Sequence, residues 1–154
     1  MLETQKNIIY NIFFLYVIFY ITIFVEWCLH KLGHINHKYN FIYHSHIEHH
    51  KRYYPVGNLL QRAPYKDGNG GYIYLCISLI IWILAYRIIQ RNIAIIFIIF
   101  SGLFIFISDY LHSQYHIKDS FLEYYFGEWF IQKRKYHFHH HRRMDKHLSL
   151  SGIY

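Results

Sequence analysis

Ten of the 14 histidines in the chain fall into four short clusters, which alternate between a pair and a triplet. The clusters are His30 and His34; His46, His49 and His50; His112 and His116; and His137, His140 and His141. On a helix, residues three and four positions apart share one face, so each cluster can project its imidazoles in one direction. Ten imidazoles exceed the needs of one ion but suit two ions with open coordination positions. Neutral imidazole binds iron, zinc, copper and nickel, so the spacing predicts a two-metal site without naming the metal.

Other uses of histidine fit the pattern less well. Histidine-rich tracts can bind metals loosely, so a zinc buffer or transporter stays open as a non-catalytic alternative. Haem ligation would require paired histidines facing each other within apolar spans, whereas these clusters lie beyond the ends of such spans. His37, His44, His139 and His147 fall outside the cluster spacing, and we expect them to form hydrogen bonds or to lie at the surface. Of these, His147 stands late enough in the chain to reach back to the metal site.

Carboxylates near the clusters are candidates for orienting the ligands. Glu26 lies four residues before His30, and Asp109 lies three residues before His112. A carboxylate on the same helical face can accept the second ring N–H of a ligand and so fix its tautomer and orientation. The alternative for Glu26 and Asp109 is solvation of a helix end at the membrane interface. Glu48, inside the second cluster, is a further candidate for an orienting partner.

Three apolar segments can position these clusters. They cover about residues 8–29, 71–89 and 93–111, and a membrane-spanning helix needs about 20 apolar residues. Hydrophobic residues make up 54% of the chain, which is high for a small soluble domain. We therefore predict an all-α fold: a single integral-membrane domain over residues 1–154, with three or four transmembrane helices. The first segment lacks a cleavage pattern and is expected to remain as an anchor.

Charge predicts how this domain is oriented. In the three-span arrangement, Lys6, Arg87 and Arg91 lie on one side of the membrane, and the rest of the 16 Lys and Arg residues lie on the other. The side rich in basic residues is normally cytoplasmic. All 14 histidines fall on that same side, in a polar cap formed by residues 30–70 and 112–154. The net charge of +7 is thereby explained without nucleic-acid binding.

Two parts of the cap have distinctive sequences. Pro55, Pro64 and the glycine-rich residues 67–71 predict a loop over residues 53–71. Residues 119–136 mix aromatic and charged side chains, which suits a helix lying in the membrane interface with its aromatic side toward the lipid. A helix packed on the other cytoplasmic segments explains this pattern equally well.

The order of the histidine clusters resembles the fatty acid hydroxylase and sterol desaturase superfamily of membrane di-iron oxygenases. In that family, a histidine pair and a His-x-x-His-His triplet follow a membrane helix, and a membrane hairpin then leads to further histidines and a second triplet. The resemblance covers about residues 26–152, and residues 49–57 resemble the segment that follows the triplet in sterol-modifying members. In length, the chain is closer to the carotenoid hydroxylases, a related short branch, although its linker between His34 and His46 is longer.

The resemblance implies a function as well as a fold. It implies that the ten clustered histidines bind two iron ions, with zinc as an alternative occupant on purification, and that dioxygen is a co-substrate. The expected reaction is hydroxylation or desaturation of a lipid, which would be a sterol, a fatty acyl chain or a carotenoid taken from the bilayer. Electrons would come from a cytochrome b-type carrier or from a ferredoxin with its reductase. The expected location is a membrane with the histidine face in the cytoplasm, the endoplasmic reticulum if the host is eukaryotic. A catalytically inactive relative is the remaining alternative.

Overall fold

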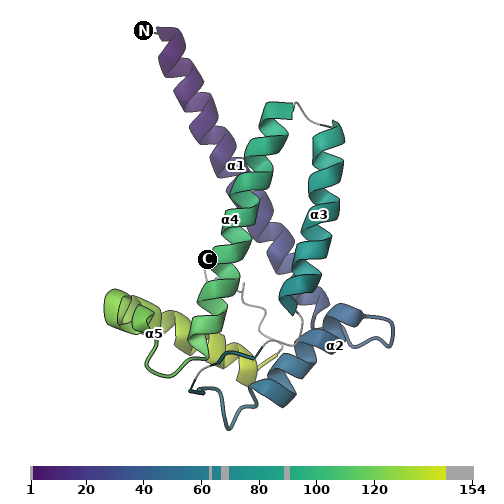
Figure 1. Ribbon diagram of the computed structural model, residues 1–154, viewed down its shortest axis with the longest axis vertical. Coiled ribbons are helices and arrows are strands. Elements are labelled where there is room, and N and C mark those ends of the chain that lie inside the picture. The colour runs from purple at the N-terminus through teal and green to yellow at the C-terminus, as the bar shows by residue number, and fades with distance from the viewer. Residues whose placement is uncertain (1, 63, 67–69, 89–90, 145–154) are drawn as a thin grey trace.

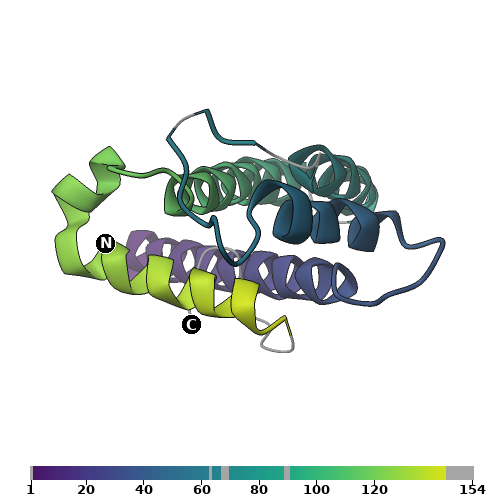
Figure 2. The same cartoon turned by 90° about the horizontal axis from the view of Figure 1, so that it is seen from below.

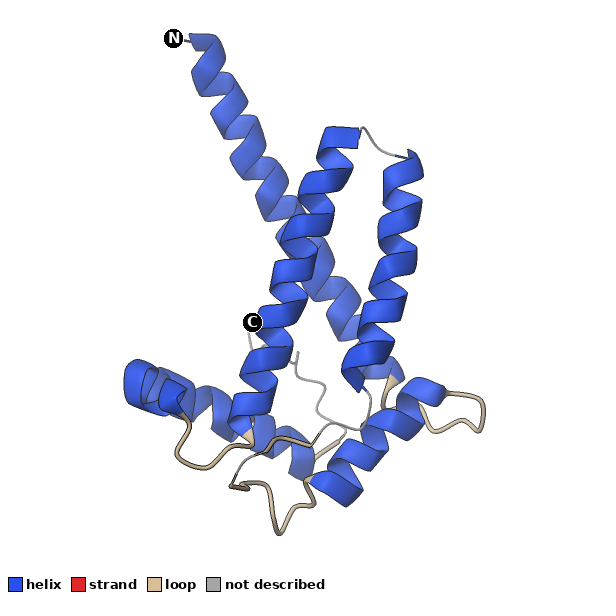
Figure 3. Ribbon diagram, viewed as in Figure 1, coloured by secondary structure: helices blue, strands red, loops and turns tan. Residues whose placement is uncertain are grey.

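The computed structural model describes residues 2–62, 64–66, 70–88 and 91–144. Within these ranges every regular element is a helix, which confirms the predicted all-α class (Figure 3). The elements are α1 (Leu2–Leu32), α2 (Phe41–Glu48), the π-helix η1 (His49–Tyr53), α3 (Gly70–Ile88), α4 (Arg91–Tyr115) and α5 (Phe121–Arg142).

The helices form two sets that meet at one end of the molecule. In the long set, α4 packs against both α1 and α3, and α1 crosses α4 at an angle (Figure 1). Phe19 of α1 meets Phe104 of α4 at the crossing, with ring centroids 5.5 Å apart. The short set, α2 and α5, lies across the end where α1 and α4 finish and α3 begins (Figure 2). One end of each of the three long helices therefore lies at this end of the molecule, which α2 and α5 cover.

Two helices have the length and composition to cross a membrane. They are Ile12–Leu32 in α1 and Arg91–Tyr115 in α4, and they include most of the predicted spans 8–29 and 93–111. The predicted third span, 71–89, corresponds to α3, of which the described apolar part, Cys76–Ile88, is shorter. Large apolar side chains on α1 and α4 point outward, as expected for surfaces that face lipid.

Small residues let the long helices pack closely. Ala94, Ser101 and Ser108 are spaced seven apart on α4 and are all buried. The indole N–H of Trp82 on α3 donates to the hydroxyl of Ser101 at 2.7 Å. Small residues at helix contacts allow backbones to approach in membranes, where no hydrophobic force drives helices together. This packing sets the positions of the helix ends that carry histidines.

Helix α5 has an exposed aromatic part and a packed part; the packed part agrees with one of the two alternatives, and the interfacial alternative stays a prediction. It bends at Gly127, whose positive φ of 49° interrupts the helix. Before the bend, Tyr124 and Tyr125 are 84% and 72% exposed, as a helix in the membrane interface requires. After the bend, Phe130 is fully buried and the helix packs on α4. The helix also runs beyond the predicted end at residue 136, so it carries the whole fourth histidine cluster.

Residues 54–66 confirm the described part of the predicted loop. The backbone of Gln61 pairs with that of the segment after α4, accepting from the N–H of Lys118 and donating to the carbonyl of His116, both at 2.9 Å. The loop is therefore held against the end of α4.

A single arginine joins α5 to the end of α4. The buried guanidinium of Arg134 contacts the carboxylate of Glu123 at 2.5 Å. It also donates to the carbonyls of Gln114 at 3.5 Å and Ile117 at 3.1 Å, and it lies over the ring of Phe130. Gln114 lies in the last turn of α4 and Ile117 follows the helix, where backbone carbonyls lack the helical partners of interior residues.

Replacing Arg134 with Met should therefore loosen α5. Buried carbonyls would lose a charged donor, which costs about 1–3 kcal/mol of unfolding free energy, or a fall of about 3–10 °C in melting temperature. Thermal unfolding in detergent measures this, with Lys135→Met, an exposed change on the same helix, as the control. Equal melting temperatures for the two variants would contradict this role for Arg134.

Candidate metal centre

All ten clustered histidines meet at the end of the molecule where the two sets of helices cross. Helix α1 and the turn after it supply the first pair, and α2 with η1 supplies the first triplet. Helix α4 and the residue after it supply the second pair, and α5 supplies the second triplet. Side chains as far as 110 residues apart in sequence thus come within contact distance.

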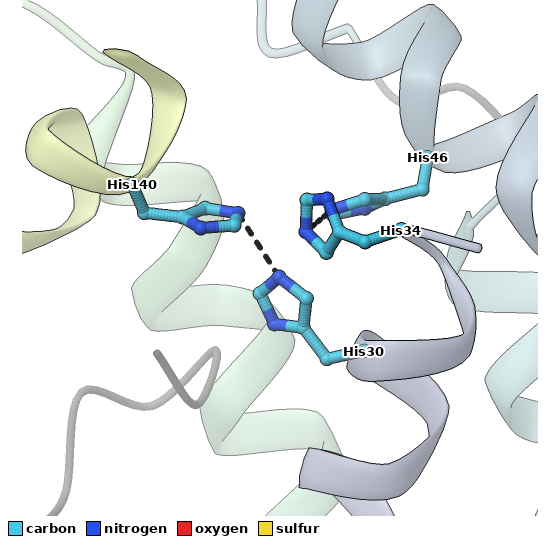
Figure 4. Close-up of side chains that lie close together, drawn as sticks. All are labelled: His30, His34, His46 and His140. Carbon is cyan, nitrogen blue, oxygen red and sulfur yellow. Dashed lines mark hydrogen bonds between the residues drawn. The ribbon is translucent and has the colours of Figure 1, made fainter. Parts of the chain in front are cut away.

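The histidines form two groups, of which the first is drawn in Figure 4. Group A consists of His30, His34, His46, His140 and His50. Ligand atoms of the first four lie within 4.8 Å of one another, and their rings point toward a common centre (Figure 4). The Nε2 atoms of His30 and His140 are 3.0 Å apart. The Nε2 atom of His46 lies 3.0 Å from those of both His34 and His50.

Group B has the same construction. It consists of His49, His112, His116, His137 and His141, all of them buried. Ligand atoms of the first four again lie within 4.8 Å of one another. The Nε2 atom of His137 lies 2.8 Å from that of His116 and 3.1 Å from that of His141.

These distances fit metal coordination better than hydrogen bonding. An imidazole Nε2 carries either one hydrogen or one lone pair in the ring plane, so it forms one good hydrogen bond. The Nε2 atoms of His46 and His137 each lie within 3.1 Å of two others. Ligand nitrogens at about 2.0–2.1 Å from an ion, and at right angles to each other, would be about 3 Å apart. A central cation therefore accounts for contacts that protons cannot.

Unsatisfied ring nitrogens point to the same conclusion. Both ring nitrogens of His49 and the Nε2 of His112 are buried without a hydrogen-bond partner in the described part of the chain. The ring centroid of His49 nevertheless lies 4.8 Å from that of His112 and 4.9 Å from that of His116. Buried polar atoms without a partner are rare and call for an explanation. A metal ion in group B would supply the missing partner.

Burial also keeps these imidazoles neutral. Desolvation, reinforced by repulsion from neighbouring imidazoles, lowers the pKa of the ligands that lie outside the candidate membrane spans. The pKa falls well below 6.5 for five residues and to about 3 for His141; the five are His46, His49, His50, His116 and His137. Metal binding requires the neutral form, so these ligands need not release protons at pH 7.

Loop residues 54–66 orient three ligands of group B. The Nδ1–H of His116 donates to the carbonyl of Leu59 at 2.9 Å, and that of His141 donates to the carbonyl of Tyr54 at 3.1 Å. The Nδ1 of His112 lies 3.2 Å from the hydroxyl of Tyr65. A hydrogen on Nδ1 leaves the lone pair on Nε2 for the metal. Sequence reasoning missed these partners, because backbone carbonyls have no signature in the sequence and nothing marks Tyr65 among 17 tyrosines.

Comparisons of the chain with protein-family models, with curated proteins and with solved structures found no match. The evidence for a metal centre is therefore its geometry.

The predicted contacts from carboxylates to ligands stay a prediction; the hydrogen bonds found at His112 and Glu48 have other partners. Asp109 is exposed, and Tyr65 occupies the place beside His112 that we predicted for it. The carboxylate of Glu48 pairs instead with Arg52 at 2.6 Å. Glu26 is buried, and the Nδ1 of His30 has no hydrogen-bond partner among the described residues. Spacing of three or four residues can place a carboxylate and a histidine on one helical face. It cannot show whether a side chain from another element, such as Tyr65 at His112, forms the hydrogen bond instead.

The histidines outside the cluster spacing behave as predicted where they are described. His37, His44 and His139 are exposed. The ring of His44 contacts the carbonyl of Lys38 at 3.1 Å. His147 lies outside the described residues.

Each group should hold its own ion. Wild-type protein should retain about two divalent ions per chain, as two-metal sites do. His46→Ala and His137→Ala each remove the histidine whose Nε2 lies between two others, so each variant should retain about one ion. Elemental analysis of the purified, dialysed protein measures the content. His139→Ala, which alters an exposed histidine of the same cluster, is the control and should keep both ions; a loss equal to that in His137→Ala would argue against the ligand sets.

The metal-free protein should lose stability in mild acid. The ligand pKa values are lower in the folded chain than the ordinary 6.5 of the unfolded chain, so the unfolded chain binds more protons as the pH falls below about 6.5. Each such ligand then lowers the free energy of unfolding by up to about 1.4 kcal/mol for each unit that the pH falls. Thermal unfolding of the metal-free protein at about pH 7.5 and pH 5.5 should show a large fall in melting temperature. The double variant His37→Asn, His44→Asn should show the same fall, and a pH-independent melting temperature would contradict the neutral cluster.

Proposed function

We propose that the chain is an integral-membrane oxidoreductase that hydroxylates or desaturates a lipid with dioxygen at two histidine-bound irons. The observation that carries this proposal is the pair of contiguous, all-histidine groups at the ends of two apolar helices. A structural metal site is normally closed with four ligands, often including thiolates. Groups of five imidazoles around each of two adjacent centres suit a redox-active ion better than a structural one.

The two groups are built as one centre. The rings of His50 in group A and His141 in group B are 4.0 Å apart. Each triplet is also divided between the groups: His46 and His50 belong to A while His49 belongs to B. In the second triplet, His140 belongs to group A, while His137 and His141 belong to group B. Ions held by the same two helical segments would act on one substrate together.

The protein's own residues prepare this centre in three ways. They present neutral lone pairs, since burial opposes protonation. They fix ring orientation through loop residues 54–66. They exclude water from group B. Bound irons would supply the dioxygen reduction and C–H oxidation that no amino acid side chain can perform.

The substrate class follows from the position of the centre. The candidate spans end at the histidines, so an alkyl chain lying along α1 and α4 would reach the centre from the bilayer. The resemblance of the cluster order to fatty acid hydroxylases and sterol desaturases supports a sterol, fatty acyl or carotenoid substrate. It also supports electron delivery by a cytochrome b-type carrier or a ferredoxin.

The orientation of the proposed enzyme can be measured. The basic residues predict that the histidine end faces the cytoplasm, which would be the cytoplasmic face of the endoplasmic reticulum in a eukaryotic host. In a background without Cys28 and Cys76, Lys118→Cys should react with an impermeant maleimide only from the cytoplasmic side. Arg91→Cys, at the other end of α4, should react only from the opposite side. The reverse labelling pattern would overturn the orientation.

Loss of one ligand from either group should abolish oxidation. We expect His49→Ala and His140→Ala to yield no lipid that has gained an oxygen atom or lost two hydrogen atoms, while both variants still insert into membranes. Mass spectrometry of lipids from expressing cells, supplied with iron and isotopically labelled dioxygen, measures the product. His139→Ala is the matched control and should retain activity.

Full activity in both ligand variants would refute the proposed centre. Wild-type protein loaded with two irons that consumes no dioxygen with a reductant would instead favour a non-catalytic metal binder or an inactive relative.

A further inference from the structure

We propose that the two groups bind metal unequally: group B takes the first ion and holds it tightly, and group A takes the second ion and exchanges it. This inference depends on the proposed metal centre but not on its oxidative activity. It follows from a difference in how the two sets of ligands are supported.

Three ligands of group B contact described residues of the loop. The ring of Tyr54 is almost wholly buried, at 1% exposed, and stacks on that of His116 with centroids 3.8 Å apart. Its hydroxyl accepts the backbone N–H of Lys66 at 2.8 Å. Its carbonyl accepts from His141, as described above. One residue therefore packs against one ligand, orients a second and anchors the end of the loop.

This support should act directly on affinity. Three of the five rings in group B, those of His112, His116 and His141, have an Nδ1 partner in the loop. Such partners fix the ring before the metal arrives, and removing one typically costs 10–100-fold in metal affinity. All ligands of group B are also buried, so water does not compete for the ion.

Group A has less support than group B, in which three ligands have an Nδ1 partner and His49 has none among the described residues. The Nδ1 atoms of His30 and His50 are buried without a hydrogen-bond partner among the described residues. His34 and His46 are only partly buried, so solvent can reach this side of the centre. Rings that are less constrained must be ordered when the ion binds, which lowers affinity.

The assembly of group A depends on one close approach. Gly33 lies between His30 and His34, and a Cβ built on it would be 3.1 Å from Cγ of His46 and 3.0 Å from the carbonyl of His30. Both contacts are tighter than ordinary van der Waals distances, so a methyl group here would displace His46. Gly57, by contrast, has no atom within 4 Å of its Cβ position. Gly33→Ala and Gly57→Ala are therefore a matched pair that differs in the effect on group A.

Cobalt(II) titration of the metal-free full-length protein in detergent tests the inference. Absorption of bound cobalt, in competition with a chelator, should show two steps, the first about 10-fold tighter or more. Tyr65→Phe removes the partner of His112 and should weaken the first step about 10-fold without altering the second. Gly33→Ala should weaken only the second step, and Gly57→Ala should alter neither. If Gly33→Ala does not fold, His34→Ala, which removes a partly buried ligand of group A, should give the same selective loss.

The outcomes separate this inference from the proposed function. Two ions bound with equal affinity, or a weaker first step in Gly33→Ala, would overturn the unequal binding and leave the two-metal centre standing. Failure of the wild-type protein to bind cobalt at all would overturn both.

Discussion

The structure depends on keeping ten imidazoles, most of them buried, close together at one end of the helices. Burial disfavours the charged form of histidine, so the rings turn lone pairs rather than protons toward one another. Lone pairs on neighbouring rings repel, and nitrogens such as those of His49 have no alternative hydrogen-bond partner among the described residues. A cation resolves both problems at once. The arrangement of the histidines therefore suits a bound cation.

Different helices position the histidine pairs and the histidine triplets. The long helices α1 and α4 bring one histidine pair each to a common end, and contacts where they cross help to set their positions. Helix α2 with η1 then supplies the first triplet, and α5 supplies the second. In the π-helix η1, the N–H of Tyr54 bonds to the carbonyl of His49 at 2.9 Å, one residue beyond the usual α-helical spacing. At its start, the rings of His49 and His50 are turned 84° from each other, and they enter different groups. One triplet can therefore contribute to two ions.

Local patterns in the sequence predicted the parts of this design that depend on local geometry. The apolar runs predicted α1 and α4, and the spacing of three and four residues predicted that each cluster shares a face. The sequence could not show which histidines share an ion, because that depends on how four separate elements pack. It also missed the carbonyls of Tyr54 and Leu59 as ligand partners, since any residue can supply a backbone oxygen. The bend at Gly127 was missed for a similar reason: glycine permits a positive φ, but only the packing of Phe130 and Arg134 on α4 requires the helix to turn there.

The position of the histidine groups suits the reaction that we propose. An oxidant for unreactive C–H bonds needs an apolar substrate on one side and electrons from a water-soluble carrier on the other. Exposed apolar residues continue from α4 into the first half of α5, where the rings of Tyr110 and Phe121 are 6.3 Å apart. In the orientation that we propose, a centre at the ends of α1 and α4 would lie at the level where the bilayer meets the cytoplasm. In that arrangement, the partly buried ligands of group A are the ones nearest to solvent, and the enclosed ligands of group B form its fixed side.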